Sequence, residues 1–157
     1  MISSAPLAPR AALYMPASNE RAIAKARTLD AEMIILDLED AVRADAKAAA
    51  RESAVAAAAQ GFGDRLCAIR LNGRGSPEHA ADLAAIAGSQ AEYAVLPKVE
   101  TVEAARGVVD ALGKPLLCMI ETPPGVLAAA DIAAVPGVAG LIAGTNDLRV
   151  DLGIPEG

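Results

Sequence analysis

Two acidic residues, Glu121 and Asp147, each lie just past the end of an apolar segment, and the two segments are successive in the chain. If these segments form neighbouring parallel strands, roughly 4.8 Å apart, both carboxylates can reach one ion. Mg2+ takes one or two carboxylates and fills its other positions with water and substrate oxygens, so a 2-oxo or 2-hydroxy acid could chelate it directly. The sequence therefore predicts Glu121 and Asp147 as magnesium ligands and, through the metal, as substrate-binding residues.

The chain offers few ligands for a zinc site. It has one histidine and two cysteines, and both cysteines, Cys67 and Cys118, lie in apolar runs. For Glu121 and Asp147 the alternative is structural. Acidic residues at such positions also serve as N-caps of the following helices or as members of surface ion pairs.

Arg70 ends another apolar run. Its planar guanidinium could hold the carboxylate of an oxo acid in two parallel charge-assisted hydrogen bonds, so we predict a catalytic and substrate-binding role. The alternative is a salt bridge at the rim of the sheet with Glu39, Asp40 or Glu121.

Three acids, Asp37, Glu39 and Asp40, lie within four positions at the end of a further strand candidate. Like charges this close raise a pKa or recruit a cation. We predict catalytic roles for Glu39 and Asp40. Three roles are open to them: orienting a metal-bound water, pairing with Arg70, or acting as a base. Asp40 is also suited to cap the turn into the next helix.

Other polar residues at strand ends suggest further roles. Lys98 could form a Schiff base with an oxo acid, but two metal carboxylates make an imine unnecessary for stabilising an enolate. Ser18, Asn19 and Arg21 open a helix whose N-terminus favours an anion, so they are candidates for binding a phosphate of coenzyme A or phosphopantetheine. Simple N-capping, with Arg21 exposed to solvent, is an equally good explanation.

Short apolar runs that alternate with longer alanine-rich segments must position these side chains. The pattern predicts six strands, at Ala11–Met15, Met33–Leu38, Leu66–Leu71, Tyr93–Leu96, Leu116–Ile120 and Gly140–Ala143. It predicts helices between them, at Asn19–Leu29, Asp45–Ala59, Pro77–Ala87, Val102–Leu112 and Gly125–Ala134. No linker or low-complexity tract interrupts the series, so residues 1–157 are expected to form a single domain.

The strand candidates are continuously apolar, as in a parallel sheet that helices cover on both faces. An open doubly wound sheet and a (β/α)8 barrel both satisfy this pattern. Charged residues follow nearly every strand, which favours the barrel, because an open sheet concentrates its site at one switch point. No glycine-rich phosphate loop of either common type is present to support the open sheet.

Composition excludes several classes of function. A net charge of -6 with scattered basic residues argues against a nucleic-acid partner. No apolar run reaches the roughly 18 residues that cross a bilayer, and the first ten residues do not resemble a signal peptide, so we expect no membrane partner and a cytoplasmic location. Small-molecule chemistry is the remaining expectation.

Six ordered segments resemble the citrate lyase beta subunit-like proteins of the HpcH/HpaI aldolase superfamily. They are LYMPASNERAIAKA from Leu13, MIILDLEDAV from Met33, IRLNG from Ile69, VLPKVE from Val95, MIETPPGV from Met119 and GTNDLRVDLG from Gly144. The resemblance implies a (β/α)8 TIM barrel of the phosphoenolpyruvate/pyruvate type that binds Mg2+. About six of the eight strand-helix units are present, so we expect an incomplete barrel that is truncated at its C-terminus.

The same resemblance implies a carbon–carbon lyase that cleaves a citryl, malyl or citramalyl thioester into a 2-oxo acid, such as oxaloacetate or glyoxylate, and an acyl thioester. The acyl group of the thioester would be carried by coenzyme A or by an acyl carrier protein. We also expect a homo-oligomer such as a trimer. Two alternatives stay open. One is a catalytically inactive barrel that acts as a binding or assembly partner, and the other is a thioester hydrolase on the same scaffold.

Overall fold

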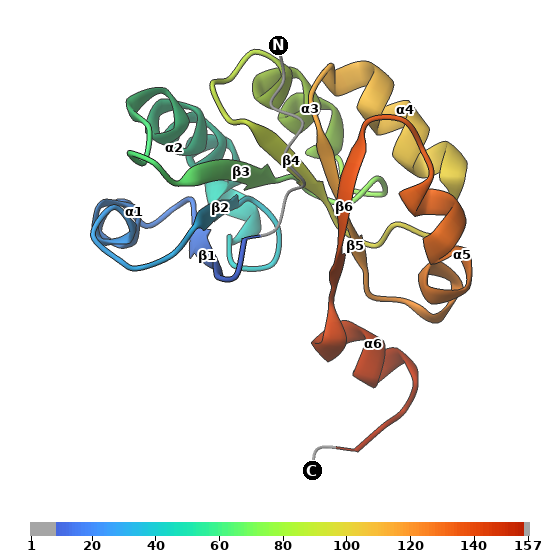
Figure 1. Cartoon of the computed structure of the whole chain (residues 1–157). Coiled ribbons are helices and arrows are strands. Elements are labelled where there is room, and N and C mark those ends of the chain that lie inside the picture. Colours follow the sequence, from blue (N-terminus) through green and yellow to red (C-terminus); the bar gives the residue numbers. More distant parts are fainter. Residues whose placement is uncertain (1–8, 156–157) are drawn as a thin grey trace.

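A computed structural model describes residues 9–155, which form one curved parallel sheet with helices along its outer side (Figure 1). The strands lie in chain order, each paired in parallel with the next. They are β1 (Ala12–Pro16), β2 (Met33–Asp37), β3 (Leu66–Arg70), β4 (Tyr93–Leu96), β5 (Leu116–Ile120) and β6 (Val138–Ala143). Because every neighbouring pair is parallel, all six strands present their carboxyl ends at one rim.

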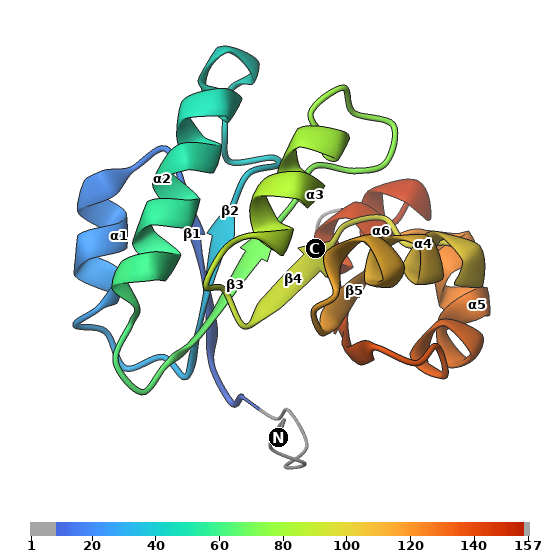
Figure 2. The same cartoon turned by 90° about the horizontal axis from the view of Figure 1, so that it is seen from above.

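The helices are α1 (Glu20–Ala26), α2 (Lys47–Gln60), α3 (His79–Ala87), α4 (Val102–Leu112), α5 (Pro123–Ala133) and α6 (Thr145–Asp151), with a short 3-10 turn, η1 (Ala44–Ala46), before α2. Helices α1 to α5 form the outer layer, whereas α6 lies beyond the end of β6 (Figures 1 and 2). None of the described helices is long and apolar enough to span a membrane.

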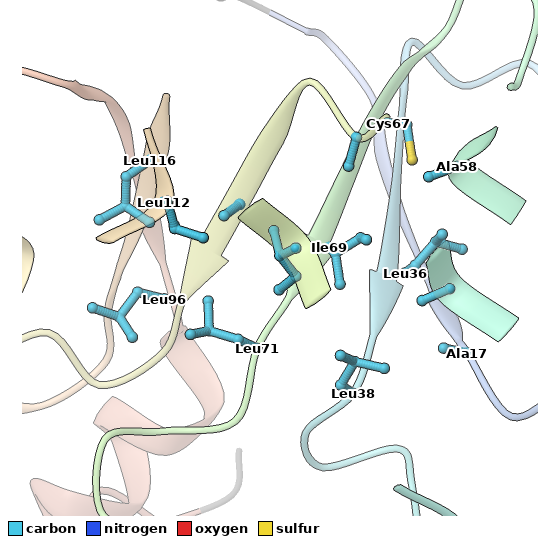
Figure 3. Packing of buried hydrophobic residues seen from close by; sticks show 14 of the residues in the cluster. Ala17, Leu36, Leu38, Ala58, Cys67, Ile69, Leu71, Leu96, Leu112 and Leu116 are labelled. Carbon is cyan, nitrogen blue, oxygen red and sulfur yellow. The ribbon is translucent and has the colours of Figure 1, made fainter. Parts of the chain in front are cut away.

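The main core lies between the outer face of the sheet and the helices (Figure 3). Alternate residues of each strand point into it, such as Leu36 and Ile69, and small helix residues such as Ala58 pack against them. Cys67 and Cys118 are buried there as free thiols, which confirms that they pack as small hydrophobes. The core thus holds the helices against the strands and fixes the spacing of the strand ends.

The other alternating residues form a second cluster on the inner face. Its buried members are Met33, Ile35, Ala68, Val95, Leu117 and Met119, with Tyr14 and Ile142 partly buried beside them. Since side chains alternate with a period of two, the polar residues that follow at the strand ends share this inner face.

The fold prediction is confirmed: six parallel β/α units match part of a (β/α)8 barrel, and all six strands lie within one or two residues of their expected positions. Two details differ. Helix α3 begins at His79 and not at Pro77, because the Ser76 hydroxyl accepts a hydrogen bond from Glu78 N in a turn. Helix α6 was not expected.

Candidate active site

One cavity of about 510 Å³ opens at the carboxyl ends of the strands. Its walls come from β1, β2, β3, β5 and the segment after β6, and they include four of the predicted catalytic or metal-binding residues: Arg70, Asp40, Glu121 and Asp147. The complete lining is Tyr14, Asp37, Asp40, Ala41, Arg70, Met119, Glu121, Ala143, Gly144, Thr145, Asn146 and Asp147. A hollow of about 340 Å³ between α1 and α2 contains none of the predicted site residues.

Arg70 is held by Asp37, its register partner on the neighbouring strand. Nε of Arg70 donates to Oδ1 of Asp37 and Nη2 donates to Oδ2, both at 2.7 Å. Both residues are buried, at 7% and 1% exposure. Burial alone would lower the pKa of Arg70, but the hydrogen bonds and charge of Asp37 outweigh it and raise that pKa, so the guanidinium stays charged.

The remaining nitrogen of Arg70, Nη1, faces the acidic turn after β2. It lies 3.0 Å from Oε2 of Glu39 and 3.8 Å from Oδ2 of Asp40, so the expected rim salt bridges to these two residues are present. The pairing with Asp37 was not expected. Because Asp37 occupies the Nε and Nη2 edge, Nη1 is the group through which Arg70 can contact a substrate carboxylate.

Glu39 carries the most perturbed carboxyl of the acidic turn. Burial raises its pKa to about 7 against the opposing effect of Arg70, and the negative charges of Asp40 and Glu121 add to the rise. Its Oε2 is buried and meets no described hydrogen-bond partner in suitable geometry, despite the short distance to Arg70. Glu39 itself does not line the cavity, whereas Asp40 does.

Glu121 follows β5 and is 3% exposed. Its Oε1 accepts a hydrogen bond of 2.8 Å from the backbone N–H of Lys98. A Cβ on Gly144 would lie 2.6 Å from Oε2 of Glu121, so only a glycine lets the chain after β6 pass this carboxylate. Burial raises the pKa of Glu121, the Lys98 N–H lowers it, and the charge of Asp147 raises it again.

Asp147 lies in the first turn of α6 and its side chain is 41% exposed. Its Oδ2 is 3.3 Å from Nζ of Lys98. Asp147 and Glu121 line both the main cavity and an adjoining one of about 280 Å³. The structure therefore brings the two predicted metal ligands to one place.

Lys98 contacts both carboxylates, through its backbone and through its ammonium. It has φ of 51°, the one positive φ among the described non-glycine residues, and this conformation directs its N–H at Glu121. Burial by itself lowers the pKa of Lys98, but the hydrogen bond and charge of Asp147 raise it overall. A protonated amine is a poor nucleophile, which weighs against the Schiff-base alternative.

The donor set at this point suits a hard divalent cation. No cluster of three or more His, Cys, Asp or Glu residues that could hold a metal occurs within residues 9–155. Mg2+, however, needs only one or two carboxylates from the protein. The negative charge of Asp147 helps to raise the pKa of Glu121, and the ammonium of Lys98 lies 3.3 Å from Asp147. A positive charge is therefore favoured between these carboxylates. Glu121 and Asp147 could hold such an ion together with water and substrate oxygens.

A second polar network, behind the cavity, fixes the acidic turn. Nζ of Lys47 donates to the backbone carbonyls of Leu38 and Glu39, at 2.8 and 2.9 Å, and to Oδ1 of Asn72 at 2.6 Å. Asn72 donates from its backbone N and Nδ2 to Oδ2 of the fully buried Asp82. The turns after β2 and β3 are thereby joined, and Glu39 is held beside Arg70.

The predicted anion-binding residues lie apart from the cavity. Oδ1 of Asn19 accepts a hydrogen bond of 3.0 Å from Ala22 N, the capping contact expected as the alternative. Ser18, Asn19 and Arg21 are exposed and none of them lines the cavity. Their role in binding an acyl carrier stays a prediction.

Tyr14, Met119 and Lys47 were missed by the sequence analysis, and Asp37 was noticed only as one acid of three. Tyr14 and Met119 point to the same inner face as Arg70 and Glu121. The alternation of side chains between the two faces of a strand would therefore have identified them. No such signal exists for Lys47, because its partners are mainly backbone carbonyls.

A protein family model described as HpcH/HpaI aldolase/citrate lyase matches residues 10–157. A (3S)-malyl-CoA thioesterase of Cereibacter sphaeroides is 43% identical over 148 residues, which cover 92% of this chain and 51% of the relative. A citrate lyase subunit beta-like protein of Mycobacterium tuberculosis is 34% identical over 141 residues, covering 90% of this chain and 49% of the relative. The chain thus spans about half the length of these curated relatives.

Solved structures show the same similarity. The citrate lyase beta subunit of M. tuberculosis, complexed with oxaloacetate and magnesium, superposes with a TM-score of 0.78 at 31% identity and covers 92% of this chain and 62% of that one. RipC from Yersinia pestis gives a TM-score of 0.74 at 31% identity, with 93% of this chain and 62% of that one covered.

Proposed function

The chain belongs to the HpcH/HpaI aldolase/citrate lyase family, and on that premise we propose that it is a Mg2+-dependent carbon–carbon lyase acting on a 3-hydroxyacyl thioester of the malyl, citramalyl or citryl type. Its products would be a 2-oxo acid and an acyl thioester. The observation that carries the proposal is the convergence of Glu121, Asp147 and Arg70 on one cavity at the strand ends. The magnesium and oxaloacetate in the complex of the M. tuberculosis relative support the choice of ion and of oxo acid.

Glu121 and Asp147 would hold the cation, and Nη1 of Arg70 would bind the substrate carboxylate. The cation, when bound, supplies Lewis-acid stabilisation of negative charge on substrate oxygens. Asp37 keeps the guanidinium in position through its two hydrogen bonds, so no reorientation is needed when substrate arrives.

The acidic turn would accept the proton of the substrate hydroxyl. Asp40 is the member that lines the cavity, and Glu39 is the member whose pKa, about 7, suits proton transfer near neutrality. As the proton leaves, the O–H electrons form the new carbonyl of the oxo acid. The carbon–carbon bond breaks and its electrons pass to the thioester fragment as an enolate, which then takes up a proton to become the acyl thioester.

Thioester hydrolysis is a second candidate, because relatives 43% identical to this chain are named (3S)-malyl-CoA thioesterases. In that reaction water adds to the thioester carbonyl, the thiol leaves and the hydroxy acid is released. The same carboxylates and Arg70 would hold the substrate. The two reactions differ only in which bond of the bound thioester breaks.

Product analysis separates the candidates. The chain would be incubated with malyl-, citramalyl- and citryl-CoA and Mg2+, and free thiol and 2-oxo acid measured in parallel. A lyase yields oxo acid without free thiol, and a hydrolase yields free thiol without oxo acid. Either activity should be lost in Glu121→Gln and kept in Asp110→Asn, a matched change on the outer helix α4. If the chain forms neither product, the catalytic proposal is wrong and the noncatalytic alternative stands.

A further inference from the structure

Two hydrogen-bond donors converge on one weak acceptor inside the main cavity. The hydroxyl of Tyr14 lies 3.7 Å from Sδ of Met119, and Nη1 of Arg70 lies 3.9 Å from the same sulfur. All three residues line the cavity and come from different strands, β1, β5 and β3. The donors therefore meet where a bound molecule would contact them.

A thioether sulfur is a poor acceptor, so neither donor gains much from this contact. Asp37 already occupies the Nε and Nη2 edge of the Arg70 guanidinium. Nη1 also lies 3.0 Å from Oε2 of Glu39, but this contact lacks hydrogen-bond geometry, so the donor can still serve an acceptor in the cavity. The phenol hydroxyl has no other described hydrogen-bond partner. A carboxylate or carbonyl oxygen that entered the cavity would be a stronger acceptor for both groups.

The Tyr14 ring is held in place independently of any ligand. It packs at the edge of the inner cluster, and the Arg70 guanidinium carbon lies 5.2 Å from its centroid, within the range of a cation–π contact. Since the ring is fixed, its hydroxyl can act as a preoriented donor that costs little conformational entropy on binding.

We propose that Tyr14 is a substrate-binding residue whose hydroxyl, together with Nη1 of Arg70, donates to one oxygen of a bound short-chain oxo acid in place of Sδ of Met119. This role deepens the proposed function and rests on it. It adds a neutral donor beside the cation and the arginine, and it favours ligands that place an oxygen at this point.

Tyr14→Phe tests the role, because it removes the hydroxyl and keeps the ring over Arg70. Binding of oxaloacetate would be measured by isothermal titration in saturating Mg2+. We expect the dissociation constant to rise about tenfold or more in Tyr14→Phe, while Mg2+ affinity and the unfolding midpoint stay unchanged. Tyr93 is the other tyrosine of the chain and packs against the same inner cluster, so Tyr93→Phe is the matched control and should bind as the parent does.

Two outcomes overturn the inference, and they differ in meaning. If Tyr14→Phe binds oxaloacetate as tightly as the parent chain, the ring has a packing role only and the proposed function is untouched. If the parent chain itself binds no oxaloacetate in Mg2+, both the inference and the proposed function fail. Tyr14→Leu serves as a further variant: lost affinity there combined with parental affinity in Tyr14→Phe again indicates packing alone.

Discussion

Arg70 is placed by a buried ion pair whose partner comes from the adjacent strand. Asp37 and Arg70 stand opposite each other in the parallel register of β2 and β3, and both point to the inner face. A buried guanidinium without a partner would be costly, so Asp37 is required for the fold as much as for the site. The pair makes Arg70 a rigid anchor at the centre of the cavity.

Removing one partner of this pair should destabilise the chain strongly. We expect Asp37→Ala to lower the free energy of unfolding by about 3–5 kcal/mol, since it leaves a buried positive charge with less compensation. Urea unfolding followed by circular dichroism measures it. Asp45→Ala breaks an exposed pair with Arg43 and should cost at most about 1 kcal/mol. Equal losses in the two variants would show that Asp37 does not balance the charge of Arg70.

The raised pKa of Glu39 predicts a specific pH dependence of stability. Its pKa is about 7 in the folded chain against a usual value of 4.5, because burial disfavours the charged form. Between these values the folded state binds more protons than the unfolded state, so stability should fall as pH rises from 4.5 to about 7. Other groups titrate in this range as well, so the effect is defined by comparison with Glu39→Gln.

Unfolding free energies of the parent and Glu39→Gln would be compared at about pH 5 and about pH 8. The parent should lose more stability over this interval than the variant, which has no carboxyl to ionise. Identical losses in both proteins would mean that Glu39 has an ordinary pKa, and its suitability as a proton acceptor would then be lost.

Residue types at strand ends allowed Arg70, Glu121 and Asp147 to be chosen from sequence, and the structure brings all three to one cavity. Their contacts were harder to predict. The partner of Arg70 depends on strand register, and the contacts of Lys98 depend on a positive φ that no residue type signals. Sequence pattern thus identifies the side chains, while tertiary register decides how they pair.

Helix α6 is the element that the sequence analysis missed, although it carries Asp147. It has seven residues, its N-cap is Gly144, and no side chain caps it. The missed helix therefore lacked the start signal that marks α4 and α5, where Thr101 and Thr122 accept hydrogen bonds from backbone N–H groups. Its position is set by the strand before it and by the close passage of Gly144 over Glu121.

Gly144 joins β6 to α6 and passes close to Glu121. In Gly144→Ala the new Cβ would lie 2.4 Å from Cβ of Glu121, so the carboxylate or the chain after β6 must shift. We expect the Mg2+ dissociation constant to rise about tenfold or more, as when residues that orient a metal ligand are changed. Isothermal titration measures the affinity.

Gly107→Ala is the matched control, since a Cβ there meets no atom within 4 Å and the residue lies inside α4. This variant should keep its Mg2+ affinity and gain about 0.5–1 kcal/mol of stability. Unchanged Mg2+ affinity in Gly144→Ala would show that the position of Glu121 does not control the ion.

Across the whole molecule, charge gathers at one rim of the sheet. The cavity and its immediate surroundings hold five carboxyl groups and two cationic side chains, all at the carboxyl ends of strands: Asp37, Glu39, Asp40, Glu121, Asp147, Arg70 and Lys98. The surplus is negative, as is the net charge of -6 on the chain. Such a field favours a divalent cation at this rim, which is the end of a TIM barrel where active sites generally lie.

The barrel-type order of the sheet could be predicted because each strand is apolar throughout and each is followed by a helix. A sequential parallel order forms when each strand is joined to the next by a right-handed crossover that contains one helix. The same order leaves β1 and β6 as edges of the described sheet, and Leu141 on β6 and Leu127 on α5 are exposed. The expected homo-oligomer stays a prediction.

The proposed chemistry depends on Glu121 and Asp147 binding one divalent cation together. The most direct measurement is the titration of Mn2+ into the chain, followed by electron paramagnetic resonance, with Mg2+ as competitor. We predict one competed site per parent chain, and a loss of affinity of about tenfold or more in both Glu121→Gln and Asp147→Asn, with Asp110→Asn unaffected. Parental affinity in either site variant would contradict the shared cation and, with it, the proposed chemistry.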